Sequence, residues 1–180
     1  MTTPKEIGDA VKRLRSAFGL GMEPTWVHVQ SRADAGDRDC YKDVERQIAE
    51  FGGEIVYGWQ VWEWPRIIIE GEFHAVWRSP EGSLIDVSLK PDGEDRIVFV
   101  PDVTRRYEGR QRDNIRLALW THPLVHRFME ACAAIHHELD ENRIGEIHAW
   151  VDTEKMATLE QRKFELQLKL MRLPRGRSND

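Results

Sequence analysis

The hydrophobic pattern changes its period twice along the 180-residue chain, from helical to strand-like and back to helical. In the N-terminal part, apolar residues recur every three or four positions over 4–18 and 40–51, which predicts two helices. Between them, residues 26–30 alternate in the manner of a strand. Stretches rich in β-branched and aromatic residues, separated by turns with Gly and Pro, then predict four more strands: 54–63, 67–78, 83–89 and 96–100.

The last third of the chain returns to the helical period. Residues 101–112 are polar and rich in arginine, which predicts a loop or a short helix. Pro123 suits a first helical position, with Thr121 or His122 as the cap. The residues expected to face inward from this helix are Leu124, Phe128, Cys132, Ile135 and Leu139. A charged helix over 153–173 and a disordered tail over 174–180 complete the prediction of a single α+β domain spanning 1–173.

The composition, 41% hydrophobic and 32% charged, is typical of a soluble globular protein. A net charge of −5 argues against a nucleic-acid partner, although the arginines from Arg105 to Arg116 could contact an anion. No apolar run is long enough to span a membrane and the chain does not begin with a signal-peptide pattern, so we expect no membrane association and a cytoplasmic location. With only Cys40 and Cys132, we expect neither a disulfide framework nor a Cys-rich zinc site.

Cys40 is a candidate nucleophile because it opens a predicted helix. The free N–H groups and the dipole of a helix N-terminus favour the thiolate form of a cysteine. The neighbouring Asp37, Asp39 and Asp43 carry negative charge that disfavours it. A positively charged imidazole would have to outweigh these three carboxylates.

His74 is the candidate base, in the string Glu-Phe-His-Ala-Val-Trp. On a strand it shares one face with Glu72, which is either a solvated sheet face or the lining of a site. Asp86 follows across the predicted turn 79–82 and should fall close to His74 in an antiparallel hairpin. Asp86 also interrupts the apolar run Leu-Ile-Asp-Val, so its carboxylate needs a partner. His74 is one option, and a cation near the turn, Arg78 or Lys90, is the other.

The order Cys40, His74, Asp86 resembles the papain-like superfamily in its broad sense, which includes transglutaminase-like and cell-wall-amidase-like thiol enzymes. The resemblance covers about residues 26–100 and implies a papain-like core, a Cys-bearing helix packed on a twisted antiparallel sheet and closed by C-terminal helices. It implies that Cys40 is the nucleophile, His74 the general base and acid, and Asp86 the residue that orients the ring. The reaction would be hydrolysis, deamidation or transfer on an amide, isopeptide or thioester.

The chain also resembles uncharacterised bacterial and phage-borne proteins with a similar Gly-Gly-Glu-Ile-Val-Tyr-Gly-Trp stretch and a His–Trp hairpin. Some of those carry a Cys-rich zinc tail of the SEC-C type, which this sequence lacks. The resemblance implies an oxyanion donor ahead of the cysteine, for which Gln30 and the backbone N–H of Cys40 are the candidates. Glu72 would line the site, and Trp59 or Trp62 would form a cleft wall.

Two alternatives stay open at this stage. The chain could be a non-catalytic protein on the same fold that binds or inhibits a partner. Such a protein could be phage-borne. Glu72, His74 and Asp86 could instead hold a divalent metal, whereas the thiol mechanism needs no metal and no cofactor. A protein or peptide-like substrate is the expected partner, and the helix over 153–173 could pair with a copy of itself to form a homodimer.

Overall fold

The computed structural model describes residues 1–19, 21–36, 40–144, 148–149 and 152–173. It separates into two compact units, Met1–Leu119 and Trp120–Asp180, which are described in turn. The single domain over 1–173 stays a prediction, and the disordered tail predicted for 174–180 lies outside the described residues.

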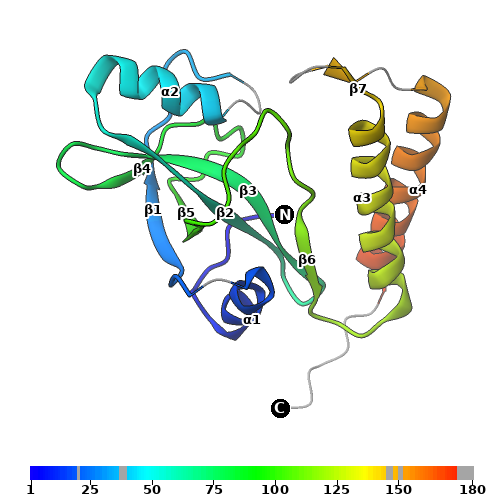
Figure 1. Ribbon diagram of the computed structural model, residues 1–180. Helices are drawn as coiled ribbons and strands as arrows, with labels where there is room; N and C mark the ends of the chain where they lie inside the picture. Colours follow the sequence, from blue (N-terminus) through cyan, green and yellow to red (C-terminus); the bar gives the residue numbers. More distant parts are fainter. Residues whose placement is uncertain (20, 37–39, 145–147, 150–151, 174–180) are drawn as a thin grey trace. The chain divides into compact units, whose positions relative to one another are not determined.

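The first unit combines two helices with a curved sheet (Figure 1). Its elements are α1 (Asp9–Phe18), β1 (Thr25–Val29), α2 (Cys40–Phe51), β2 (Glu54–Trp64), β3 (Ile68–Arg78), β4 (Leu84–Asp86), β5 (Arg96–Pro101) and β6 (Ile115–Ala118). The α+β class predicted from the sequence is confirmed.

Five of the strands close into a small barrel. Their order is β2-β5-β1-β4-β3, and the long antiparallel ladder between β2 and β3, from Glu54↔Arg78 to Trp64↔Ile68, closes the ring. The β1–β4 pair is parallel, and the other barrel pairs are antiparallel. The sixth strand, β6, extends the sheet by pairing with the first residues of β3.

Alternation along each strand divides the apolar residues between the two faces of the barrel wall. The outer face carries Trp59, Phe73 and Val100, on which α1 and α2 pack. The inner face carries Val27, Val76, Ile97 and Phe99, which fill the barrel. His74 adjoins Phe73 and therefore points to the inner side of the wall.

Gly58 and Gly71 allow two aromatic rings to approach the sheet closely. A Cβ at Gly58 would lie 2.4 Å from the Phe99 ring inside the barrel, and one at Gly71 would lie 2.4 Å from the Phe18 ring outside it. These distances are too short for a Cβ atom. The two rings can therefore occupy their positions only because residues 58 and 71 are glycine.

The strands β3 and β4 separate soon after they pair, and this separation creates the site. β3 pairs with β4 at Trp77 and Arg78, and with β6 over 68–71. Over the described residues, no strand covers the same edge of β3 between them. The N-terminal turn of α2 fills this position: Tyr41 Oη donates to the Phe73 carbonyl at 2.9 Å, and the Gln111 amide donates to the same oxygen at 2.9 Å.

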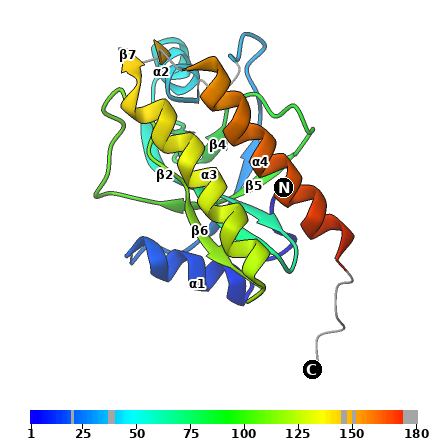
Figure 2. The same ribbon diagram turned by 90° about the vertical axis from the view of Figure 1, so that its right-hand side faces the viewer.

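The second unit contains two long helices, α3 (Pro123–Glu141) and α4 (Thr153–Arg172), with the short strands β7 (Arg143–Ile144) and β8 (His148–Ala149) between them. The two helices pack side by side (Figure 2). The His122 ring caps α3 by accepting the Leu124 N–H at 3.1 Å, which confirms one of the two predicted caps. The described part of the chain contains no helix long and apolar enough to cross a membrane.

Several boundaries differ from the prediction. The first helix begins at Asp9 instead of Pro4, because Thr2 forms a β-bridge with Glu63 and Thr3 bonds to Glu94, which keeps the preceding chain extended. The strand predicted over 83–89 is limited to Leu84–Asp86, because the chain then turns to bring Ser88 back to Asp86. Strands β6, β7 and β8 were not predicted. Phe128 is buried as predicted for this helix, but Val125 and Ala131 are buried in addition, and Leu139, predicted to face inward, is 38% exposed.

Candidate active site

His74 and Asp86 meet inside the barrel wall. Asp86 Oδ2 lies 3.0 Å from His74 Nε2, and both residues are buried, with Asp86 0% and His74 5% exposed. The strands explain the contact, since β4 lies beside β3 in the antiparallel register that the hairpin spacing predicted. With Nε2 occupied, Nδ1 is the ring nitrogen left to interact with another group.

Asp86 is the centre of a larger polar cluster. Its Oδ1 accepts hydrogen bonds from the Ser88 backbone N–H at 3.0 Å and from Ser88 Oγ at 2.6 Å. Its Oδ2 is also 2.8 Å from Lys90 Nζ. Burial by itself would raise the pKa of Asp86, but the positive charges of His74 and Lys90 outweigh it and hold the pKa well below the usual range. Asp86 is therefore a carboxylate at neutral pH.

Cys40, the first residue of α2, lies close enough to act electrostatically on His74. Burial favours the neutral ring, yet Cys40 and Asp86 together raise the pKa of His74 to about 10. Burial, with a smaller contribution from Cys40, raises the pKa of Tyr41 above its usual value. The Cys40 side chain is half-buried, against the hydrophobic core. His74 and Asp86 are thus in direct contact, and Cys40 lies near enough to raise the pKa of the ring.

Of the three acidic neighbours of Cys40, only Asp43 lies within the described residues. Asp43 is 0% exposed and forms an ion pair with Arg46, so its charge is compensated. Its Oδ1 also accepts the Gly36 backbone N–H at 3.1 Å. Asp37 and Asp39 lie outside the described residues. Asp43 is buried because the chain before α2 folds back over it.

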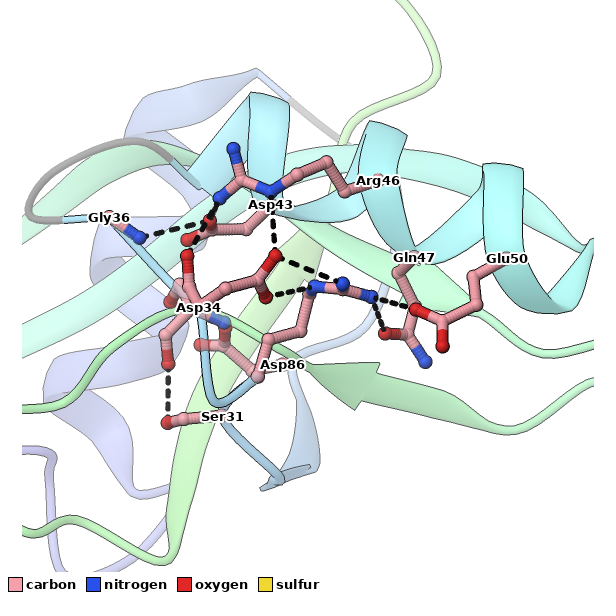
Figure 3. Close-up of polar contacts among 10 residues, drawn as sticks. Ser31, Asp34, Gly36, Asp43, Arg46, Gln47, Glu50 and Asp86 are labelled. Carbon is pink, nitrogen blue, oxygen red and sulfur yellow. Dashed lines mark hydrogen bonds and ion pairs between the residues drawn. The ribbon is translucent and has the colours of Figure 1, made fainter.

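That preceding segment ties α2 to the strand end that carries Asp86 (Figure 3). The Arg32 guanidinium binds Asp34 at 2.8 Å, Gln47 at 2.8 Å and Glu50 at 3.1 Å, which joins the segment to successive turns of α2. Its backbone N–H donates to the Val87 carbonyl at 2.9 Å. The helix that positions Cys40 is therefore fixed to the chain next to Asp86 by one arginine. Sequence reasoning missed this role of Arg32.

Gln30 contacts Asp86 through its backbone. Its N–H donates to the Asp86 carbonyl at 2.8 Å, while its side chain is exposed and makes no hydrogen bond with Cys40 or His74 in the described part of the chain. The structure therefore gives no support to the Gln30 amide as an oxyanion donor. The backbone N–H of Cys40, at the start of α2, belongs to the turn whose N–H groups have no partner within the helix.

The two tryptophans have separate positions. Trp59 is 2% exposed, stacks on Phe18 and donates to Asp102 at 3.0 Å, so it belongs to the core on the outer face and does not form a cleft wall. Trp62 is half-buried and donates to Glu72 at 2.7 Å. Trp62 and Glu72 lie on the same side of the sheet as His74, because residues 60 and 72 are paired in register and strand side chains alternate.

The metal alternative finds no support among the residues that the structure describes. No three His, Cys, Asp or Glu side chains in this part of the chain gather closely enough to hold an ion. Glu72 binds the Trp62 indole, while the contacts of Asp86 are with His74, Lys90 and Ser88.

Lys90 and Gln60 complete the buried cluster. The sequence analysis treated His74 and Lys90 as alternative partners of Asp86. The structure shows that Asp86 contacts both. Gln60 was not predicted. The only signal for it in the sequence is a polar residue inside the apolar strand Tyr-Gly-Trp-Gln-Val-Trp.

Comparisons with protein-family models, with curated proteins and with solved structures find no match to this chain. The argument about function therefore rests on the cluster itself.

Proposed function

We propose that this protein is a cysteine-dependent acyl enzyme in which Cys40 is the nucleophile, His74 the general base and acid, and Asp86 the residue that orients the ring. One observation carries the proposal: the buried imidazole is bound through Nε2 to a carboxylate at 3.0 Å, which leaves Nδ1 for another group, and Cys40 lies near enough to raise the pKa of the ring. A cysteine that opens a helix, a histidine on one strand and a carboxylate on the next are the parts of a thiol triad.

The chemistry needs only these groups and water. The Cys40 thiolate would attack the carbonyl carbon of an amide, isopeptide or thioester, and the backbone N–H of Cys40 would donate to the developing oxyanion. The bond from the carbonyl carbon to its leaving nitrogen or sulfur then breaks, and His74 gives its proton to an amine leaving group. Water, with its proton taken by His74, or an acceptor amine would release the acyl group from sulfur. Asp86 stays ionised throughout and holds the ring in place.

The arrangement of the elements supports the papain-like layout as part of the proposal. Helix α2 packs on β3 and β2, β3 supplies His74, and β4, its neighbour in the barrel, supplies Asp86. We propose a protein or peptide-like substrate in the cytoplasm, with Glu72 and Trp62 lining the site on the His74 side. Pairing of two copies through α4 stays a prediction, which sedimentation equilibrium would test.

The experiment that tests the proposal is site-resolved alkylation by iodoacetamide between pH 6 and 9. Peptide mass spectrometry reports Cys40 and Cys132 separately, so each chain carries its own reference thiol. We expect Cys40 to react well below pH 8, where an ordinary thiol with a pKa of about 8.5 is mostly protonated. His74→Gln should remove this advantage and leave Cys132 unchanged. Equal rates and equal pH profiles for the two cysteines would refute the proposal.

A second candidate function, a non-catalytic binding or inhibitor protein, is favoured by the burial of the cluster. Asp86 is 0% exposed and its hydrogen bonds are satisfied within the protein, as expected for a structural network. The two functions differ in one measurement with a generic acyl probe. An acyl enzyme treated with p-nitrophenyl acetate would become acetylated at Cys40 and release the label with turnover, whereas a binding protein would not be acetylated at this residue.

A further inference from the structure

Lys90 lies beside the buried His74–Asp86 pair. Its Nζ lies 2.8 Å from Asp86 Oδ2, the same oxygen that lies 3.0 Å from His74 Nε2, and its side chain is 9% exposed. A lysine is seldom buried to this extent without a specific partner. Two cationic side chains therefore share one carboxylate oxygen.

Gln60 is a second hydrogen-bond partner of Lys90. Its Oε1 accepts from Lys90 Nζ at 2.9 Å, and because an ammonium group can only donate, the amide oxygen must face the lysine. This orientation leaves the buried Gln60 Nε2 without an acceptor among the described residues. The buried amide nitrogen is left unpaired so that the amide oxygen can accept from Lys90.

The charged groups around His74 come from α2, β4, the loop after β4 and β3 itself. Helix α2 contributes Cys40 and β4 contributes Asp86, and both favour the protonated ring. The loop after β4 contributes Lys90, which opposes it. Glu72 lies on the same face of β3, and β2 places Gly58, which has no side chain, opposite the ring.

We propose that Lys90 is a positioning residue of this site, which fixes the Asp86 carboxylate through the shared oxygen and limits how tightly that carboxylate holds the His74 imidazolium. This inference rests on the proposed function. When the bond between the carbonyl carbon and the amine breaks, the proton on His74 moves to the leaving nitrogen and the ring becomes neutral. Lys90 keeps its charge, so Asp86 stays paired and hydrogen-bonded in both protonation states of the ring. Without Lys90, the imidazolium would be the only counter-charge of the carboxylate, and the His74 ring would give up its proton less readily.

The first test compares Lys90→Met with Lys90→Arg by NMR titration of the His74 imidazole nitrogens. The measurement is made in the Cys40→Ser chain, where loss of the thiol charge brings the midpoint to a lower and more accessible pH. We expect Met to raise the proton affinity of His74 by about tenfold, which is one pKa unit. Arg keeps the positive charge, so it should restore the midpoint of the chain with Lys90.

The second test uses two acetyl donors on the chain with Cys40 intact. A p-nitrophenyl ester has a leaving group that needs no proton, whereas a p-nitroanilide has one that does. Lys90→Met should slow acetylation by the anilide about tenfold more than acetylation by the ester, because only the anilide depends on release of the His74 proton. A merely structural role of Lys90 would slow both donors equally.

An unchanged His74 midpoint in Lys90→Met would overturn the inference, as would equal slowing of the two donors. If Lys90→Met fails to fold, Gln60→Met removes the second anchor of the lysine while keeping every charge, and it should raise the His74 midpoint by a smaller amount. No change in the Gln60 variant then overturns the inference. An unreactive Cys40 in the native chain would instead overturn the proposed function, so the two failures are distinguishable.

Discussion

Replacement of Asp86 by Asn tests the centre of the cluster with the smallest change in shape. The amide keeps one oxygen, which can still accept the hydrogen bonds that Ser88 now gives to Oδ1 at 3.0 and 2.6 Å. The amide nitrogen then occupies the position of Oδ2, where it faces two other donors, His74 Nε2 and Lys90 Nζ. The lysine loses its counter-charge while its side chain is 9% exposed.

The expected magnitudes follow from these contacts. Breaking a buried ion pair by removing one partner costs about 3–5 kcal/mol of unfolding free energy, and retention of the Ser88 bonds places Asp86→Asn near the lower end. The amide also favours the ring tautomer with its proton on Nδ1, which cannot accept a proton from Cys40. An ordinary thiol is about 1% ionised at pH 6.5, so alkylation of Cys40 at this pH should fall by up to about a hundredfold.

The assay combines urea unfolding with the site-resolved alkylation rate at pH 6.5. Ser88→Ala is the matched control, because it removes one hydrogen bond to the same carboxylate and should cost about 1 kcal/mol without slowing Cys40. The reasoning is refuted if Asp86→Asn keeps the native alkylation rate. Slowing of Cys40 by the same factor in Ser88→Ala would also refute it, since general loosening of the site would then suffice.

Three further predictions concern His74, Asp102 and Gly58. His74 should keep its ring proton up to about pH 10, and Cys40→Ser should lower the NMR midpoint, because the Cys40 charge raises the pKa. Asp102 is 2% exposed and its burial opposes ionisation, yet bonds from Arg105, Thr104 and the Trp59 indole lower its pKa to about 2. Its contribution to stability is therefore complete above its ordinary value of 3.8 and is lost as the pH falls toward 2. In Asp102→Asn, the unfolding free energy measured with urea should fall less steeply with acid, by no more than about 2 kcal/mol in total. An unchanged pH slope would contradict the low pKa of Asp102. Gly58→Ala should destabilise by at least about 2 kcal/mol, because its Cβ would meet the Phe99 ring at 2.4 Å; native stability would contradict this contact.

The sequence determined the local elements with strong periodic signals. Helix α2 has the predicted bounds, since apolar residues at helical spacing and a Gly pair after residue 51 leave little alternative. The long strands β2 and β3 and the approach of Asp86 to His74 were also predictable, because a hairpin turn fixes which residues face each other across it.

Tertiary structure decided what these elements surround. Closure of the barrel depends on pairings between strands far apart in sequence, and it determines which face of β3 is enclosed. Strand β6 has a weak pattern of its own and forms because the edge of β3 is available to it. Burial of Asp43, Gln60 and Lys90 could not be predicted for the same reason: a polar residue is buried only where distant parts of the chain supply its partners, and the local sequence does not encode those distances.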